Sequence, residues 1–204
     1  MDRRDFLISG TLGLVGAVAG CTKASTGADS PIGSVDSPRG DSQPATCTAT
    51  ASDIEGPYYL EDVPVRSKLD LYGDEGSPLL LSGVVVDESC QPIVGAIVEL
   101  WHADPDGAYD TTSPEKRYYG QVATEPDGSY GFTTLMPGHY LNGSEYRPAH
   151  LHMKVWVDGV ERLTTQIYFE GDPYNATDGW YDPAREIAPD AEGAATFDVT
   201  VSRG

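Results

Sequence analysis

The chain is predicted to fold as an all-β protein, an antiparallel β-sandwich with long functional loops. Apolar runs of strand length recur along it, and turn signals such as Pro126-Asp127-Gly128 and Asp158-Gly159 stand between them. No stretch shows sustained helical periodicity. Beyond an N-terminal region of different composition, about 155 residues remain, which is enough for one domain with a core of its own.

The predicted strands are apolar runs that follow one another at residues 79–86, 93–101, 119–124, 130–135, 150–157, 161–169 and 195–201. Several of the intervening segments are longer than a hairpin turn. We expect these segments to be the loops that carry function at the ends of a sandwich.

Residues 1–20 are typical of an export signal. Arg3-Arg4 precede a weakly apolar run that ends at Gly20, as in a twin-arginine signal peptide. That run is too short to span a bilayer as a mature anchor. The four residues ending in Cys21 resemble a lipobox, in which cleavage precedes the cysteine and its thiol carries a lipid. The alternative is an ordinary signal with a chance cysteine.

Residues 21–50 are rich in Ser, Thr, Gly, Pro and Ala without periodicity, which predicts a flexible tether. Residues 51–204 then form the sandwich domain. Together, the signal, Cys21 and the tether predict an extracytoplasmic protein that is exported by the twin-arginine route and anchored to the membrane by lipid.

The three cysteines fit this location. If Cys21 is lipidated, Cys47 and Cys90 are left as a pair in an oxidising compartment. A disulfide that closes this loop of roughly 43 residues would contribute about 4 kcal/mol in the chain-entropy model. Two unpaired buried thiols are the alternative.

The formal net charge is −19, which excludes nucleic acid as a natural partner. Only 4 Lys accompany 20 Asp. This balance is compatible with a high-salt habitat, where screening shortens the reach of self-repulsion, and equally with an acidic exported surface.

The most informative motif is Arg147-Pro148-Ala149-His150-Leu151-His152, which opens a predicted strand. Because side chains alternate along a strand, His150 and His152 face the same side, roughly 6 to 7 Å apart. One metal ion can bridge two imidazoles at that separation, and histidine is the commonest metal ligand. A polar pair on the surface is the alternative.

Further motifs give the histidine pair a context. Upstream stand Trp101-His102-Ala103-Asp104-Pro105-Asp106-Gly107-Ala108-Tyr109 and Pro137-Gly138-His139-Tyr140, with Glu55-Gly56-Pro57-Tyr58-Tyr59 before them and Leu163–Phe169 after them. Over roughly residues 47–175 the chain resembles the intradiol ring-cleavage dioxygenases, the family of catechol and protocatechuate dioxygenases.

The resemblance implies a non-haem Fe(III) centre with the ligands Tyr109, Tyr140, His150 and His152. The donor set is chemically sensible, because a phenol with an ordinary pKa near 10 becomes a ligand only where a strong Lewis acid removes its proton. Two anionic oxygens favour Fe(III), whereas zinc sites usually draw on Cys, His and carboxylates.

The resemblance also implies a reaction between a small aromatic diol and O2. The catechol would lose both protons and bind iron in place of Tyr140, which would leave as a base, and the ring would open to a muconate-type diacid. Arg147 would stabilise the negative charge that grows on the ring oxygens. Gln166 matches a catalytic position near the O2 site, and Tyr58 would contact the substrate together with Arg147.

Two other protein classes share part of the pattern. A transthyretin-like or carboxypeptidase-regulatory-like binding module has the same order of strand and turn residues as residues 84–140. Such a module needs no metal, so it would not require His150 and His152. A cupin that binds Mn or Zn would use His-x-His, yet its carboxylate and third histidine have no helpful spacing here. His102 and His139 are interpreted as structural residues.

The chain departs from the family in two respects. Tyr140 and His150 are only ten residues apart, a short connection that helps to shape the cavity. The helical N-terminal dimerisation segment of catechol-type enzymes has no counterpart. The sequence therefore leaves the ring substituents of the substrate and the oligomeric state open.

Overall fold

The computed structural model describes residues 46–203. The predicted signal, Cys21 and the tether up to residue 45 lie outside the described residues. Within residues 46–203, no helix is long and apolar enough to cross a membrane.

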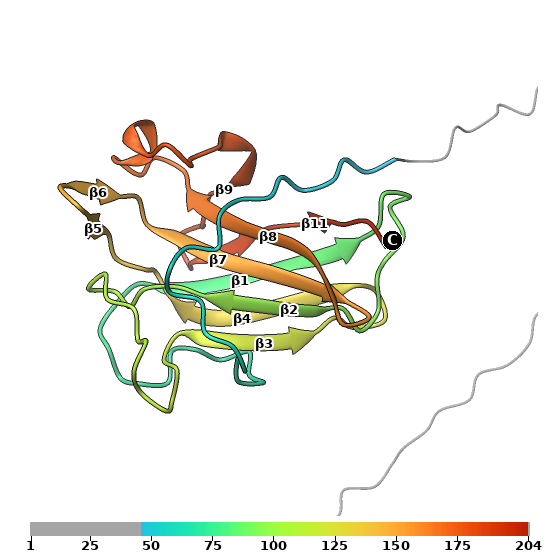
Figure 1. The fold of residues 1–204 in the computed structure, drawn as a ribbon, viewed down its shortest axis with the longest axis horizontal. Helices are drawn as coiled ribbons and strands as arrows, with labels where there is room; N and C mark the ends of the chain where they lie inside the picture. The colour runs from blue at the N-terminus through green and yellow to red at the C-terminus, as the bar shows by residue number, and fades with distance from the viewer. Residues whose placement is uncertain (1–45, 204) are drawn as a thin grey trace, which may run out of the picture. The chain divides into compact units, whose positions relative to one another are not determined.

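The described part is a sandwich of two β-sheets, as predicted (Figure 1). One sheet has the order β3-β2-β7-β8-β9, and in the other β1 pairs with β4 on one edge and with β10 and β11 on the opposite edge. The strands are β1 Pro78–Val86, β2 Ile97–Trp101, β3 Tyr119–Ala123, β4 Ser129–Leu135, β5 Tyr140–Asn142, β6 Glu145–Arg147, β7 His150–Val157, β8 Val160–Phe169, β9 Glu186–Ile187, β10 Ala194–Thr196 and β11 Val199–Thr200, with short 3-10 helices η1 Asn175–Thr177 and η2 Pro183–Arg185.

The core lies between the two sheets, and strand alternation decides which side chains enter it. Leu151, Met153 and Val155 of β7 belong to the main hydrophobic cluster. The intervening His150 and His152 therefore point to the other face of the five-stranded sheet, yet they are 2% and 1% exposed. Something must cover that outer face.

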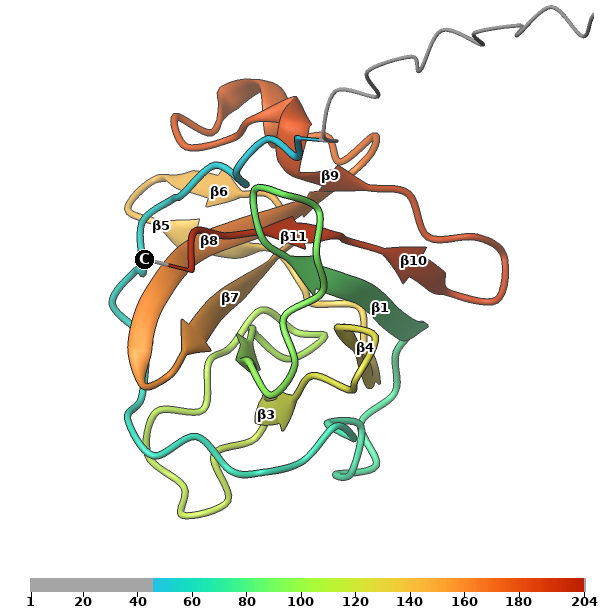
Figure 2. The ribbon, with the colours of Figure 1, turned by 90° about the vertical axis from the view of Figure 1, so that its right-hand side faces the viewer.

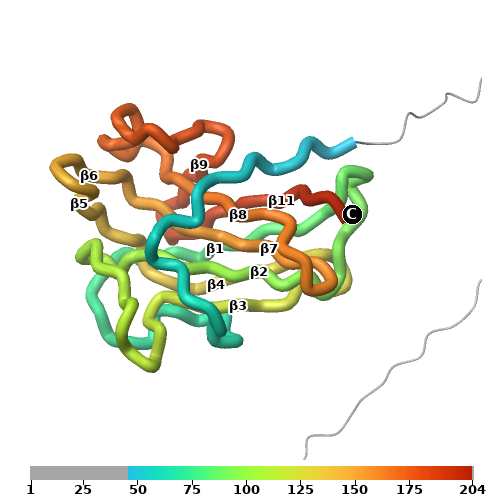
Figure 3. The backbone as a smooth tube through the Cα atoms, viewed as in Figure 1, coloured from blue at the N-terminus to red at the C-terminus, as the bar shows by residue number. Residues whose placement is uncertain are grey.

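The N-terminal segment, residues 46–64, provides much of the cover (Figure 3). Its Asp53 amide bonds to Thr164 of β8, Gly56 lies against His152 of β7, and the Tyr59 ring packs on Trp101 of β2. The start of the segment is joined to the β1–β2 turn by a disulfide between Cys47 and Cys90, with 5.3 Å between their Cα atoms.

The strand boundaries differ from the prediction in three places. The run 93–101 becomes a strand only at Ile97, because Gly95 has a φ of +72° and the amide of Ala96 bonds to the side chain of Thr124. The run 195–201 is split into β10 and β11. These two strands join β1 in parallel, and β9 joins β8 in parallel, so the sheets are not purely antiparallel (Figure 2).

The third difference is at the connection between Tyr140 and His150, which forms a hairpin of β5 and β6. Tyr140 and Arg147 are direct partners across this hairpin. The short connection is thus a hairpin that holds two predicted site residues side by side.

Candidate active site

His150 and His152 lie next to one another on the outer face of β7, with 4.8 Å between their ring centroids. Their neighbours on β8 are Tyr168 and Gln166, and Trp101 of β2 faces His152 from the other side. The i, i+2 spacing thus places both imidazoles on one face, as predicted.

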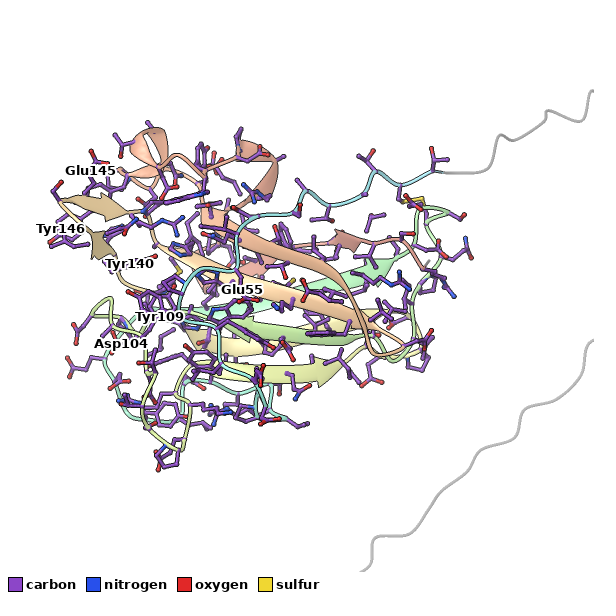
Figure 4. The ribbon with its side chains drawn as sticks, viewed as in Figure 1. Glu55, Asp104, Tyr109, Tyr140, Glu145 and Tyr146 are labelled. Carbon is purple, nitrogen blue, oxygen red and sulfur yellow. A yellow bond between two sulfur atoms is a disulfide. The ribbon has the colours of Figure 1, made fainter. Side chains whose placement is uncertain are left out.

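Tyr109 and Tyr140 come from two loops whose backbones interlock. Asp104 accepts the amides of Asp106 and Ala108 with its side chain and those of Gly107 and Gly138 with its carbonyl, which ties both loops to one residue. A Cβ atom at Gly107 would lie 2.1 Å from the His139 carbonyl oxygen, so only glycine allows this approach. The ring centroids of Tyr109 and Tyr140 lie 5.6 Å apart. Both residues lie at the same end of the sandwich (Figure 4).

The polar atoms of these four side chains converge. Tyr109 Oη lies 3.1 Å from His152 Nε2 and 3.4 Å from His150 Nε2. Tyr140 Oη is joined to the group through Arg147 Nη1, which is 3.3 Å from that oxygen and 3.4 Å from His150 Nε2. Donor atoms that share one metal ion at about 2 Å lie roughly 3 Å apart, so the three contacting donors have a suitable spacing.

The protonation states also suit a metal. His150 Nδ1 donates to the Pro148 carbonyl at 2.7 Å, which leaves the Nε2 lone pair facing Tyr109 and Arg147 Nη1. Burial, together with the charge of Arg147, lowers the pKa of His150 to about 3, so the imidazole is neutral. Burial also raises the pKa of the Tyr109 phenol well above its usual value, so only a strong Lewis acid would ionise it.

His152 contacts Tyr109 through its Nε2, and on its Nδ1 side stacking takes the place of a hydrogen bond. Its Nδ1 is buried and has no hydrogen-bond partner among the described residues. The indole of Trp101 lies parallel to the imidazole, at 4.8 Å and 8°. Tyr59 packs behind Trp101 and donates to Glu99, so it belongs to this support and not to the donor group.

The donor set fits iron better than zinc. Across residues 46–203 no three His, Cys, Asp or Glu side chains form a group able to hold a metal. The donors in contact are the Tyr109 phenol and the two imidazoles, with the Tyr140 phenol joined to them through Arg147, and phenolate oxygens favour Fe(III).

Arg147 is the basic side chain in contact with the donors, and it is 4% exposed. Its Nη1 faces Tyr140 and His150, while its Nε bonds to Asp178 Oδ2 at 2.7 Å. Burial alone would lower the pKa of Arg147, but the hydrogen bond to Asp178 and the neighbouring Tyr140 outweigh it and raise this pKa above its ordinary value. The guanidinium is permanently charged.

Gln166 reaches the donor group through Arg147. Its Nε2 donates to the Ile54 carbonyl at 3.0 Å, which turns its Oε1 toward Arg147 Nη2 at 2.9 Å. Oε1 also accepts from the hydroxyl of Tyr168 at 3.2 Å. These contacts show that Gln166 holds Arg147 by a hydrogen bond, and its role near the O2 site stays a prediction.

Tyr58 stacks on Tyr109, with 4.3 Å between centroids and 17° between planes, and meets Tyr140 edge-on at 6.0 Å. It is therefore a neighbour of both predicted ligands. His102 is fully buried between the Ala103 carbonyl and the Thr134 hydroxyl, and His139 pairs with Asp172 at 2.7 Å. Both contact sets suit the structural interpretation.

Sequence reasoning missed the residues that support the site from a distance in the chain. Asp178 and Trp180 follow the last motif considered, and Asp53 precedes the first. Asp178 contacts Arg147 although the two residues are 31 positions apart in the sequence, and no local sequence pattern predicts such a contact. Asp104 could have been found, because an Asp followed by Pro and Gly is a turn signal.

Comparisons with known proteins show which family the chain resembles. The sequence model of a protein family described as "Dioxygenase" matches residues 54–188. Chlorocatechol 1,2-dioxygenase of Pseudomonas putida is 38% identical over 141 residues, covering 60% of this chain and 54% of that protein. Catechol 1,2-dioxygenase 1 of Acinetobacter lwoffii is 37% identical over 163 residues, covering 69% of this chain and 52% of that protein.

Solved structures agree as well. The dioxygenase domain of a dioxygenase and carbohydrate-binding protein fusion from Streptomyces sp. SirexAA-E superposes with a TM-score of 0.71 at 36% identity, covering 77% of this chain and 100% of that one. Chlorocatechol 1,2-dioxygenase of Pseudomonas putida superposes with a TM-score of 0.69 at 33% identity, covering 75% of this chain and 72% of that one. The chain spans little more than half the length of the curated relatives it matches. With the fold, the converging phenols and imidazoles and the family match in agreement, the chain belongs to the intradiol ring-cleavage dioxygenase family.

Proposed function

We propose that this protein opens the ring of a catechol between its two hydroxylated carbons, with O2 as co-substrate and Fe(III) as cofactor. The observation that carries the proposal is the convergence of Tyr109, His150 and His152 within 3.4 Å, with Tyr140 beside them. Both atoms of O2 enter the muconate-type diacid, so the reaction balances without a reductant.

Tyr109, Tyr140, His150 and His152 would hold the metal. A ferric ion supplies Lewis acidity toward the phenol and catechol oxygens and accepts electron density from the ring. The chain supplies the rest. The phenolate of Tyr140 is suited to take a proton from a substrate hydroxyl, because burial raises the pKa of Tyr140, although Arg147 partly offsets this.

Arg147 would stabilise the negative charge on the substrate oxygens. Its Nη1 already faces the donor atoms, and the guanidinium is itself buried, so that its fixed positive charge acts with little screening. Tyr58, flat against Tyr109, would form one wall of the substrate site.

We also propose that catechols without a carboxylate are preferred. Among the described residues, Arg147 contacts the donors, Lys154 lies against Tyr59, and Arg185 lies against Tyr168. These three cations are paired with acidic residues: Arg147 with Asp178, Lys154 with Glu55 and Glu161, and Arg185 with Asp53. A ring carboxylate would meet no unpaired positive charge from these three residues.

Oxygen uptake by the iron-loaded protein tests the function. Catechol, hydroxyquinol and protocatechuate would be compared, with product identified by mass. We expect a coloured protein, ring-opened diacids, and a lower kcat/KM for protocatechuate than for catechol. A colourless protein that is filled with zinc and inactive with iron would instead favour the binding-module interpretation.

For location, we propose export by the twin-arginine route and lipid anchoring at Cys21. The support is in the sequence alone: Arg3-Arg4, the weakly apolar run and the lipobox-like residues before Cys21. An aromatic diol and O2 both reach an extracytoplasmic enzyme by diffusion, so the location and the reaction are compatible.

A further inference from the structure

The guanidinium of Arg147 has three edges, and each faces a different partner. Nε and Nη2 bond to the two carboxylate oxygens of Asp178, at 2.7 and 3.3 Å. Nη2 also donates to Gln166 at 2.9 Å. Because the fork is planar and rigid, these contacts leave Nη1 as the group that points to the donor atoms.

Asp178 is itself fixed. Its side chain is 1% exposed, and its Oδ1 accepts the amide of Trp180 at 2.8 Å. The indole of Trp180 covers the guanidinium at 4.6 Å from the ring centroid. Arg147 is thus held at its edge by a carboxylate and on its face by an aromatic ring, both from the segment between β8 and β9.

That segment is anchored to the N-terminal segment. Arg185 pairs with Asp53 at 2.5 Å, and both side chains are nearly buried. The same Asp53 accepts from the Tyr168 hydroxyl at 3.1 Å, next to Gln166. Asp178 therefore reaches Arg147 from a rigid support.

We propose that Asp178 is a positioning residue that sets which N–H of Arg147 faces the reacting oxygens. The proposal rests on the proposed function. Its physical basis is that a charge-stabilising group works only when it is held at the right distance, and a shift of about 1 Å can cost on the order of a hundredfold in rate.

If Asp178 served only as the counter-ion of Arg147, a different result would be expected. A buried guanidinium needs a negative partner, and loss of that partner destabilises the fold whatever the geometry of the pair. In that case any carboxylate at position 178 would serve. Asp178→Glu separates the two roles, because it keeps the charge and lengthens the side chain by one methylene.

The experiment compares Asp178→Glu and Asp178→Asn with wild type, in the full chain loaded with iron. Asp182→Ala is the matched control, since Asp182 lies on the same segment and caps η2 through the amide of Ala184. Each Asp178 variant is also combined with Arg147→Ala. The readouts are kcat per bound iron, KM, the visible band of the resting protein and the thermal midpoint.

For Asp178→Glu we expect a wild-type midpoint and resting band, a similar KM, and a kcat about 10- to 100-fold lower. The kcat of Asp178→Asn should also be lower than that of wild type, whereas the kcat of Asp182→Ala should be unchanged. In the Arg147→Ala background, neither Asp178 variant should lower kcat further, because both act through the same guanidinium.

Two results would contradict the positioning role of Asp178 but not the proposed dioxygenase function. One is an Asp178→Glu protein with full activity. The other is an Asp178 substitution that lowers kcat equally in the presence and in the absence of Arg147. A wild-type protein that takes up no O2 with any catechol contradicts the proposed function, and this role with it.

Discussion

The backbone of Gly107 lies directly against the carbonyl of His139, so close that a Cβ atom at Gly107 would be 2.1 Å from that oxygen. Gly107 stands two residues before Tyr109, and His139 stands one residue before Tyr140. The contact therefore fixes the two predicted tyrosine ligands relative to each other through the backbone, independently of any metal.

Gly107→Ala tests this contact. Gly107 has a φ of +86°, and the added methyl would force the two loops apart. We expect a loss of at least about 3 kcal/mol in the free energy of unfolding, together with reduced iron content. Gly159→Ala is the control, because Gly159 has a φ of +74° but open space around it and should cost about 1 to 2 kcal/mol with iron retained. Equal costs at both positions would contradict the interlocking of the loops.

Tyr109→Phe should bleach the visible band of the iron-loaded protein and weaken metal binding. The Tyr109 oxygen is the one that both His150 and His152 contact, so its removal takes a donor from the centre of the group. Iron content and the visible spectrum check this. Tyr130→Phe removes a phenol that donates to the Phe197 carbonyl in the core, and it should leave the colour unchanged.

Arg147→Ala and His150→Ala should separate charge stabilisation from metal binding. A guanidinium has no lone pair for a metal, so we expect Arg147→Ala to keep iron and the resting band while turnover falls by about a hundredfold or more. His150→Ala should lose both iron and colour. Iron and O2 uptake are measured on the same samples.

Two results would revise the role of Arg147. An Arg147→Ala protein without iron would show that the residue is structural, and one with full activity would show that the charge is stabilised elsewhere. Some loss of stability is expected in either case, because Asp178 is left buried without its partner.

Acid should destabilise the fold in part through His102. Burial lowers the pKa of His102 to about 4, so between pH 6.5 and 4 the unfolded chain binds a proton at this position that the folded protein does not. Stability from this group is complete above pH 6.5 and is lost as the pH falls toward 4, by on the order of 3 kcal/mol.

His102→Gln should flatten the fall of the free energy of unfolding between pH 7 and pH 4.5, measured by chemical denaturation. His139→Gln is the control, since that ring is 38% exposed. The charge of His102 also lowers the pKa of His150 and His152, but burial is the larger cause there, so the difference in slope reports chiefly His102. Identical slopes would show that His102 is already protonated in the fold, or that it titrates as it does in the unfolded chain.

Arg3→Lys with Arg4→Lys should hold the precursor inside the cell, and Cys21→Ser should release the exported protein from membranes. Twin-arginine recognition needs the guanidinium pair, and lipid attachment needs the thiol. Cell fractionation followed by detection of the full-length and processed chains checks both. A Cys21→Ser protein that still sediments with membranes would contradict the lipobox interpretation.

The sequence by itself determined the sandwich and the chemistry of the site. Strand-length apolar runs and turn signals predict the strands because side-chain alternation and turn conformations are local properties of the chain. The same alternation places His150 and His152 on one face, and the resemblance to the intradiol dioxygenases singles out Tyr109 and Tyr140 among 12 tyrosines as the phenol donors.

Only the tertiary structure decided how these residues are supported. Asp178 meets Arg147 across 31 positions and Ile54 fixes the amide of Gln166 across 112, while Trp101 orients His152 from a neighbouring strand. The parallel strands β9, β10 and β11 also pair with distant partners. Such contacts depend on which segments of the folded chain become neighbours, and a periodic pattern in one segment carries no information about its partner.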